Sequence, residues 1–209
     1  LVGVGALARA DGAAVLAKAR ALSTVNDDWN GFGVLHTAAS RVGGLDLGFV
    51  PGEDGKDVEA ILADAESGDI ETVYLLGADE FDASRLQNAF VIYQGALGDA
   101  GAHAADVILP GAAYPEKSST YVNMEGRAQR SQRAVFPPGD GREDWSILRA
   151  LSGAMDATLP YNDLRGLREA MEAACPVLGD LDAQAPGEWG AFGVEGALES
   201  APFVSSVQN

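Results

Sequence analysis

Short apolar runs alternate with helical patterns along the first two thirds of the chain. The runs are brief, nearly continuous in apolarity and rich in β-branched or aromatic residues, which is typical of strands buried on both faces of a parallel sheet. The predicted strands cover residues 1–4, 70–76, 89–93 and 106–109. Because strands that alternate with helices build βαβ units, the pattern predicts an α/β fold with doubly wound, mostly parallel sheets.

Four amphipathic helices are expected between and after these strands. Asp11 and Asp57 are candidate N-caps for the first two, and Gly68 is placed to end the second. Asn162 is a candidate N-cap for the last helix, which Pro176 is expected to stop. Apolar stripes predict the core-facing sides: Val15, Ala19 and Leu22; Val58, Ile61, Leu62 and Ala65; Ile147, Leu148, Leu151 and Met155; Leu164, Leu167, Met171 and Ala174.

The pattern changes after the last predicted strand. Residues 111–136 are polar and loop-rich, and we expect a long excursion that carries short strands. We expect residues 1–180 to form one α/β domain and residues 181–209, which become rich in Gly, Pro and Ser, to form an extended tail. The chain opens on Leu1 within an apolar run, so we expect it to be a segment of a longer protein.

Composition excludes several classes of function. The 209 residues carry 31 acidic and 14 basic side chains, a net charge of −17, which argues against nucleic acid or an anionic lipid surface as a direct partner. No apolar run is long enough to span a membrane. Cys175 is the single cysteine, predicted to be a buried structural thiol, so a disulfide within the chain and a Cys-rich zinc or iron–sulfur site are excluded. With only His36 and His103, we expect no metal site and no catalytic residues in this segment.

Glycine-rich turns follow three of the predicted strands. Residues 3–8 match G-x-G-x-x-A, residues 77–80 read Gly-Ala-Asp-Glu, and residues 95–101 hold three glycines. Ligands bind at the carboxyl ends of strands in open α/β sheets, and glycines there let a phosphate approach the backbone. The same turns also serve simply to connect strand to helix, and the sequence leaves both interpretations open.

A dense polar cluster lies within the excursion. Glu116, Lys117, Asn123, Glu125 and Arg127 combine carboxylates, an amide and two cations within twelve residues. Carboxylate–arginine pairs and amide contacts could hold a polar ligand or could organise the loop itself. Both interpretations remain open at this point.

A long motif in this region resembles a known family. Residues 104–129 read AADVILPGAAYPEKSSTYVNMEGRAQ, which is similar to the A-D-V-x-L-P … E-x-x-G-T-x-x-N-x-E-G-R-x-Q signature of the molybdopterin oxidoreductases. More narrowly, residues 29–32, 35–48 and 74–80 resemble the large iron–sulfur subunits of bacterial respiratory complex I, the homologues of the mitochondrial 75-kilodalton subunits. The resemblance covers roughly residues 1–180.

The resemblance implies a pterin-binding region, which we expect to be vestigial here. The residues that match its loops are Gly77, Asp79, Glu116, Thr120, Asn123, Glu125 and Arg127. Ser119 stands where the motif has glycine, and its Cβ obstructs close approach of a ligand. The tail is also too short for the domain that closes over the pterin in this family. The resemblance therefore implies no cofactor in this segment, with iron–sulfur clusters bound by a more N-terminal portion.

The function implied by the resemblance is structural. We expect a rigid part of the peripheral arm of complex I, on the cytoplasmic side of the bacterial inner membrane, that contacts other peripheral-arm subunits. The complete enzyme passes electrons from NADH to quinone and pumps protons. Two alternatives remain: a fragment of an active molybdopterin enzyme such as formate dehydrogenase, and a stand-alone nucleotide-binding module that uses the glycine turns.

Overall fold

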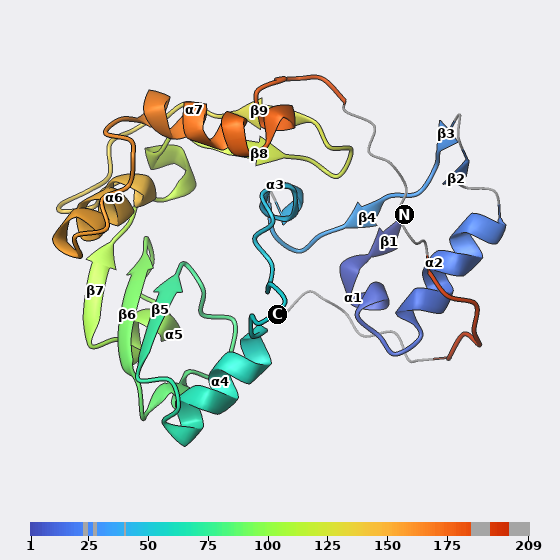
Figure 1. Ribbon diagram of the computed structural model, residues 1–209, viewed down its shortest axis with the longest axis horizontal. Helices are drawn as coiled ribbons and strands as arrows, with labels where there is room; N and C mark the ends of the chain where they lie inside the picture. Colours follow the sequence, from blue (N-terminus) through green and yellow to red (C-terminus); the bar gives the residue numbers. More distant parts are fainter. Residues whose placement is uncertain (23–24, 27–28, 40, 185–192, 201–209) are drawn as a thin grey trace.

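A three-stranded parallel sheet forms the centre of the best-packed part of the chain. The computed structural model describes residues 1–22, 25–26, 29–39, 41–184 and 193–200 (Figure 1). Strands β5 (Thr72–Leu76), β6 (Phe90–Gly95) and β7 (Val107–Pro110) lie in the order β5-β6-β7. Val73 pairs with Val91 and Tyr93 with Ile108. Three predicted strands and the α/β class with parallel sheets are thus confirmed.

Helix α4 (Val58–Ser67) packs against one face of this sheet. The Asp57 carboxylate accepts a hydrogen bond from the Ala60 amide at 2.9 Å, and Gly68 ends the helix with a φ of 85°, as predicted. The buried core contains Leu62 and Ala65 of α4, Leu86 of the 3₁₀ helix η1 (Ala83–Leu86), and Val73, Leu75, Val91 and Tyr93 of the sheet. Val58, predicted to face the core, is 65% exposed because it lies in the first turn.

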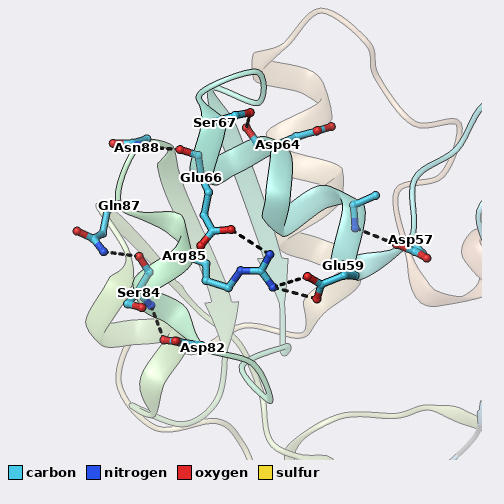
Figure 2. Close-up of polar contacts among 11 residues, drawn as sticks. Asp57, Glu59, Asp64, Glu66, Ser67, Asp82, Ser84, Arg85, Gln87 and Asn88 are labelled. Carbon is cyan, nitrogen blue, oxygen red and sulfur yellow. Dashed lines mark hydrogen bonds and ion pairs between the residues drawn. The ribbon is translucent and has the colours of Figure 1, made fainter.

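A polar network on the surface joins α4 to η1 (Figure 2). The Arg85 guanidinium donates to the Glu59 carboxylate at 2.9 Å and forms an ion pair with Glu66 at 3.0 Å. Asn88 donates to the backbone carbonyl of Glu66 at 2.7 Å. These contacts fix the β5–β6 connection against α4, and the short helix α5 (Ala100–Ala104) then leads into β7.

The predicted excursion forms an antiparallel hairpin. After the 3₁₀ helix η2 (Tyr114–Glu116), strands β8 (Thr120–Val122) and β9 (Ala128–Arg130) pair with Tyr121 opposite Gln129. Helices α6 (Asp144–Ala154) and α7 (Leu164–Ala174) follow, and then the 3₁₀ helix η3 (Pro176–Leu178). Val122, Ala128 and Leu178 form a second small core, against which the half-buried Cys175 packs.

Two predictions about these helices are wrong in detail. Asp163, rather than Asn162, caps α7, since its carboxylate accepts from the Gly166 amide at 2.7 Å. Asn162 instead accepts from the Arg149 guanidinium at 2.7 Å. Met155 lies just past the end of α6 and is 67% exposed, so it does not extend the apolar stripe.

The N-terminal part of the chain forms a separate small unit of short elements. Strand β1 (Val2–Gly3) is shorter than predicted, because helix α1 (Val4–Leu7) begins directly after it. It pairs in parallel with β4 (Val34–Leu35), and β2 (Val25–Asn26) pairs antiparallel with β3 (Trp29–Asn30). The other helices are α2 (Gly12–Ala21) and α3 (Arg41–Asp46). In Figure 1, α1 and α2 lie on the opposite side of the molecule from β7 and α6.

Asp11 does not cap α2 as predicted, because its side chain has other partners. It is buried, and it accepts hydrogen bonds from the Arg9 guanidinium at 2.8 Å and from the Glu199 amide at 2.8 Å. The Val194 amide donates to the carbonyl of Ala13 at 3.1 Å. Residues 193–200 therefore run along α2, while most of the predicted tail, residues 185–192 and 201–209, lies outside the described residues.

Among the helices in the described ranges, none combines the length and apolarity needed to cross a membrane.

Candidate functional site

A buried polar network occupies the carboxyl edge of the β5-β6-β7 sheet. The Tyr74 hydroxyl donates to the side-chain carbonyl of Gln94, which is completely buried. The Gln94 amide donates to the Asp144 carboxylate at 3.1 Å and to the Asp144 backbone carbonyl at 3.2 Å. The Lys117 ammonium completes the network through an ion pair with Asp144. The network therefore connects the sheet with η2 and with the start of α6.

The same network makes the tyrosine hydroxyl a poor acid. Burial, together with the negative charge of Asp144, raises the pKa of Tyr74. The hydroxyl therefore remains a hydrogen-bond donor to Gln94 at neutral pH. Because the members satisfy one another, the network serves to hold α6 on the sheet.

Gly111 allows this close approach of α6 to the sheet. A Cβ at Gly111 would lie 2.8 Å from Oδ1 of Asp144 and 3.3 Å from the carbonyl carbon of Gly95. The Gly111 amide donates to the Gly95 carbonyl at 2.8 Å. A side chain at this position would force the carboxylate or the backbone to move.

The glycine turn after β6 makes room for a tyrosine ring. A Cβ at Gly95 would collide with the ring of Tyr93, and one at Gly101 would lie 2.6 Å from the ring's Cε2 atom. Burial, with smaller contributions from Asp79 and Asp99, raises the pKa of this Tyr93. These two glycines thus accommodate a core side chain of the chain itself.

The other two glycine turns also serve local structure. Gly77 has a φ of 59°, which favours glycine, and its amide donates to the Gln94 carbonyl at 2.7 Å. Asp79 follows it at the rim of the Tyr93 site. The segment that matches G-x-G-x-x-A is a strand-to-helix turn from β1 into the four-residue helix α1.

Glu116 and Thr120 occupy structural positions at the start of the excursion. The Glu116 carboxylate accepts from the Ala113 amide at 2.9 Å and so closes the turn η2. Thr120 begins β8, next to Ser119, whose amide donates to the Ser131 hydroxyl at 3.1 Å. Ser119, which replaces the glycine of the motif, is therefore built into the connection between the two arms of the hairpin.

Asn123, Glu125 and Arg127 organise the tip of the hairpin. The Asn123 side-chain oxygen accepts from the amides of Glu125 at 2.9 Å and Arg127 at 3.0 Å. Gly126 within this turn has a φ of 78°. The Arg127 guanidinium donates to the backbone carbonyl of Asp182 at 2.5 Å, which ties the tip to the segment after η3.

The structure does not bring the predicted pterin-loop residues together into one site. Glu116 closes one turn, while Asn123, Glu125 and Arg127 organise another, and Gly77 and Asp79 flank the sheet. No buried side-chain nitrogen or oxygen among the described residues lacks a hydrogen-bond partner. The residues present therefore do not fit a pterin dinucleotide, whose polar edges would need donors and acceptors that are engaged within this chain.

A cavity of about 220 Å³ lies beside the network and includes residues that the sequence analysis missed. Lys117, Ser118, Ser119 and Thr120 line it together with Trp145 of α6 and with Leu164, Leu167, Arg168 and Met171 of α7. Burial, and the nearby charge of Arg130, lower the pKa of Arg168. No sequence motif pointed to Trp145 or Arg168, because their amphipathic helices predicted only core-facing stripes.

No group of three or more His, Cys, Asp or Glu side chains in the described ranges could hold a metal ion.

Comparisons with known proteins give a consistent relationship. A family model described as molybdopterin oxidoreductase matches residues 1–154. The NADH-ubiquinone oxidoreductase 75 kDa subunit of Reclinomonas americana is 41% identical over 189 residues, covering 88% of this chain and 26% of that protein. In the NADH-quinone oxidoreductase of Rickettsia bellii, the subunit designated G is 36% identical over 213 residues, covering 100% of this chain and 30% of that protein. The chain therefore spans less than a third of the length of these relatives.

The structural comparison adds a distant likeness. Acetylene hydratase from Pelobacter acetylenicus gives a TM-score of 0.44 at 20% identity, over 50% of this chain and 17% of that chain. This likeness carries no argument below.

Proposed function

The chain belongs to the molybdopterin oxidoreductase family, and on that premise we propose that it is a structural part of the large iron–sulfur subunit of a respiratory NADH–quinone oxidoreductase, complex I. The relatives named for that subunit match between 88% and 100% of the chain. In this role the segment itself performs no chemistry. It forms a rigid body that supports neighbouring parts of the assembly.

The single observation that carries a structural role is the network of Gln94, Asp144 and Lys117. Ligands of open α/β sheets bind at the carboxyl ends of the strands. Here that edge is closed by side chains of the chain itself, with Gln94 completely buried and hydrogen-bonded to Asp144. A site that is filled and satisfied in this way supports a segment without pterin or molybdenum.

The activity of the complete assembly follows from this assignment. We propose that the whole enzyme passes electrons from NADH to a quinone and couples the transfer to proton pumping. Iron–sulfur clusters would be bound by a portion outside these 209 residues, since Cys175 is the one cysteine of the sequence. The segment would belong to the peripheral arm on the cytoplasmic side of a bacterial inner membrane, in contact with other peripheral-arm subunits.

The alternatives have less support. The glycines that a nucleotide-binding module would use at residues 95 and 101 are explained by the packing of Tyr93. A fragment of an active enzyme such as formate dehydrogenase would need a pterin site, and the candidate residues are separated and engaged locally.

The role can be tested with variants of the complete subunit in its native membranes. Arg127→Ala removes the contact that ties the hairpin tip to the Asp182 carbonyl. We expect less assembled complex, with unchanged NADH–quinone turnover per assembled complex. Arg165→Ala is the matched control, because Arg165 lies on the exposed side of α7 and pairs only with Glu169 in the part of the chain that the structure describes. Unchanged assembly with slower turnover for Arg127→Ala would contradict a structural role.

A further inference from the structure

The basic residues of this acidic chain are concentrated in one region. Eight of its 14 lysines and arginines lie within residues 117–168, among six carboxylates. Residues 42–116 hold 15 carboxylates and only Lys56 and Arg85 as basic residues. Such an uneven distribution makes different surfaces attractive to partners of different charge.

An exposed aromatic residue lies within this basic region. Phe136 is 77% exposed, and the adjacent Val135 is 54% exposed. The Arg133 guanidinium carbon lies 4.2 Å from the centroid of the Phe136 ring, a cation–π contact. Beside them is a hollow of about 310 Å³, lined among others by Arg133, Phe136, Pro137, Arg142, Trp145 and Ser146. We call Arg133, Val135, Phe136, Arg142 and Trp145 the arginine–aromatic surface.

One guanidinium of this surface has donors available for a ligand. Within the described ranges, Arg142 donates one side-chain hydrogen bond, to the Gly141 carbonyl at 2.8 Å, out of five N–H groups. The nearest lining carboxylate, Glu143, already accepts from Arg133 at 3.3 Å and from the Trp145 indole at 2.9 Å. Arg142 is therefore free to pair with a carboxylate from elsewhere, and its planar fork favours bidentate contact.

The backbone under this surface is held firmly. The Arg142 amide donates to the Pro110 carbonyl at 3.1 Å, and the Ala134 amide donates to the Pro115 carbonyl at 2.8 Å. The Arg133 amide donates to the Ser118 hydroxyl at 3.1 Å. A surface fixed in this way loses little conformational entropy on binding.

From these observations we propose that the arginine–aromatic surface is a docking site for an acidic segment of another protein, with a carboxylate on Arg142 and an apolar side chain in the hollow between Phe136 and Trp145. Exposed aromatic and arginine side chains around a pocket are the composition of interface hot spots. A polyanion such as nucleic acid is disfavoured by the net charge of −17, whereas a short acidic segment meets only the local positive charge. This inference rests on the proposed function, because the partner is taken to be another subunit of the same assembly.

The test uses the complete subunit in native membranes. A photo-crosslinking phenylalanine analogue replaces Phe136, and the crosslinked peptide is identified by mass spectrometry from the NADH-oxidising assembly. We expect a peptide of a different polypeptide, with carboxylates next to an apolar residue. Arg142→Glu in the same background lowers the crosslink yield about tenfold, and a charge-reversing lysine in the partner peptide restores it. The matched controls are the same analogue at Phe49, an exposed phenylalanine outside the surface, and the Arg165→Glu variant.

Three results would overturn the proposal: a crosslink to a second copy of this chain, a crosslinked peptide without carboxylates, or an equal loss of yield for Arg142→Glu and Arg165→Glu. These results leave the proposed function standing, since the subunit was recovered from the assembly. Absence of the subunit from the NADH-oxidising assembly would instead contradict the proposed function itself.

Discussion

The buried amide of Gln94 holds the Asp144 carboxylate 3.1 Å away, and this contact attaches the first turn of α6 to the central strand of the parallel sheet. The two residues are 50 positions apart in the chain. Their contact closes the sheet edge at which a ligand would otherwise bind, so it links the stability of the fold to the absence of a site.

Replacing Gln94 with leucine should destabilise the chain. The change removes the hydrogen bonds to Asp144 and leaves the Tyr74 hydroxyl without its acceptor, which costs about 2–3 kcal/mol of unfolding free energy. Denaturant unfolding measures this loss. Gln87→Leu, at an exposed glutamine that donates to the Ser84 carbonyl, should change stability by less than about 0.5 kcal/mol. Equal effects of the two substitutions would show that the buried network contributes nothing.

Gly111→Ala should also be destabilising, for a steric reason. The new Cβ would lie 2.8 Å from the Asp144 carboxylate and close to the backbone of Gly95, a strain of about 1–3 kcal/mol. Gly98→Ala is the control, because a Cβ there meets no atom within 4 Å. The midpoints of thermal unfolding of the two variants distinguish these cases, and a Gly111→Ala variant as stable as the parent would refute the packing argument.

The surface network around Arg85 should contribute little to stability. Its partners Glu59 and Glu66 are largely exposed, so Arg85→Ala should cost no more than about 1 kcal/mol, and the loss should shrink as salt is added. The neighbouring Leu86→Ala removes a buried side chain and should cost about 2–5 kcal/mol at any salt concentration. Urea titrations at low and high ionic strength test both expectations, and a large, salt-independent loss for Arg85→Ala would contradict them.

The docking of residues 193–200 on α2 should weaken in acid. The hydrogen bond from Arg9, followed by that from the Glu199 amide, lowers the pKa of Asp11 below its ordinary value of 3.8. A lowered pKa means that the stabilisation is present above about pH 4 and is lost as the pH falls through the lowered value. The NMR amide signals of Val194 and Glu199 should therefore shift with a midpoint below 3.8, and Asp11→Asn should abolish this transition. A midpoint above 3.8 would mean that the contact with Arg9 does not stabilise the carboxylate.

The fold was predictable where its determinants are local. Short apolar runs located β5, β6 and β7, and the pair of Asp57 and Gly68 located both ends of α4. The cap of α7 was misplaced by one residue because Asn162 and Asp163 are adjacent and both are good capping residues. The burial of Asp11 was not predictable, since its partner Glu199 lies 188 residues further along the chain.

The candidate site was predictable only as a set of residues. The motif located Glu116, Asn123 and Arg127, but each of them acts within its own turn, which a one-dimensional pattern does not reveal. The Gln94–Asp144 contact carried no sequence signal, because a glutamine inside an apolar strand acquires its meaning only from the helix that packs on it. The glycines at 95 and 101 likewise suited either a ligand or a tyrosine ring until the packing of Tyr93 was known.

The central claim is that this chain works inside a large respiratory assembly without a cofactor of its own. The most direct measurement is a native gel of source membranes solubilised in mild detergent, with the chain located by mass spectrometry and molybdenum measured in the same band. We predict that the chain migrates in a very large NADH-oxidising band together with other complex I subunits and without molybdenum. Migration as a small species that retains molybdenum would contradict the account and would identify an independent pterin enzyme.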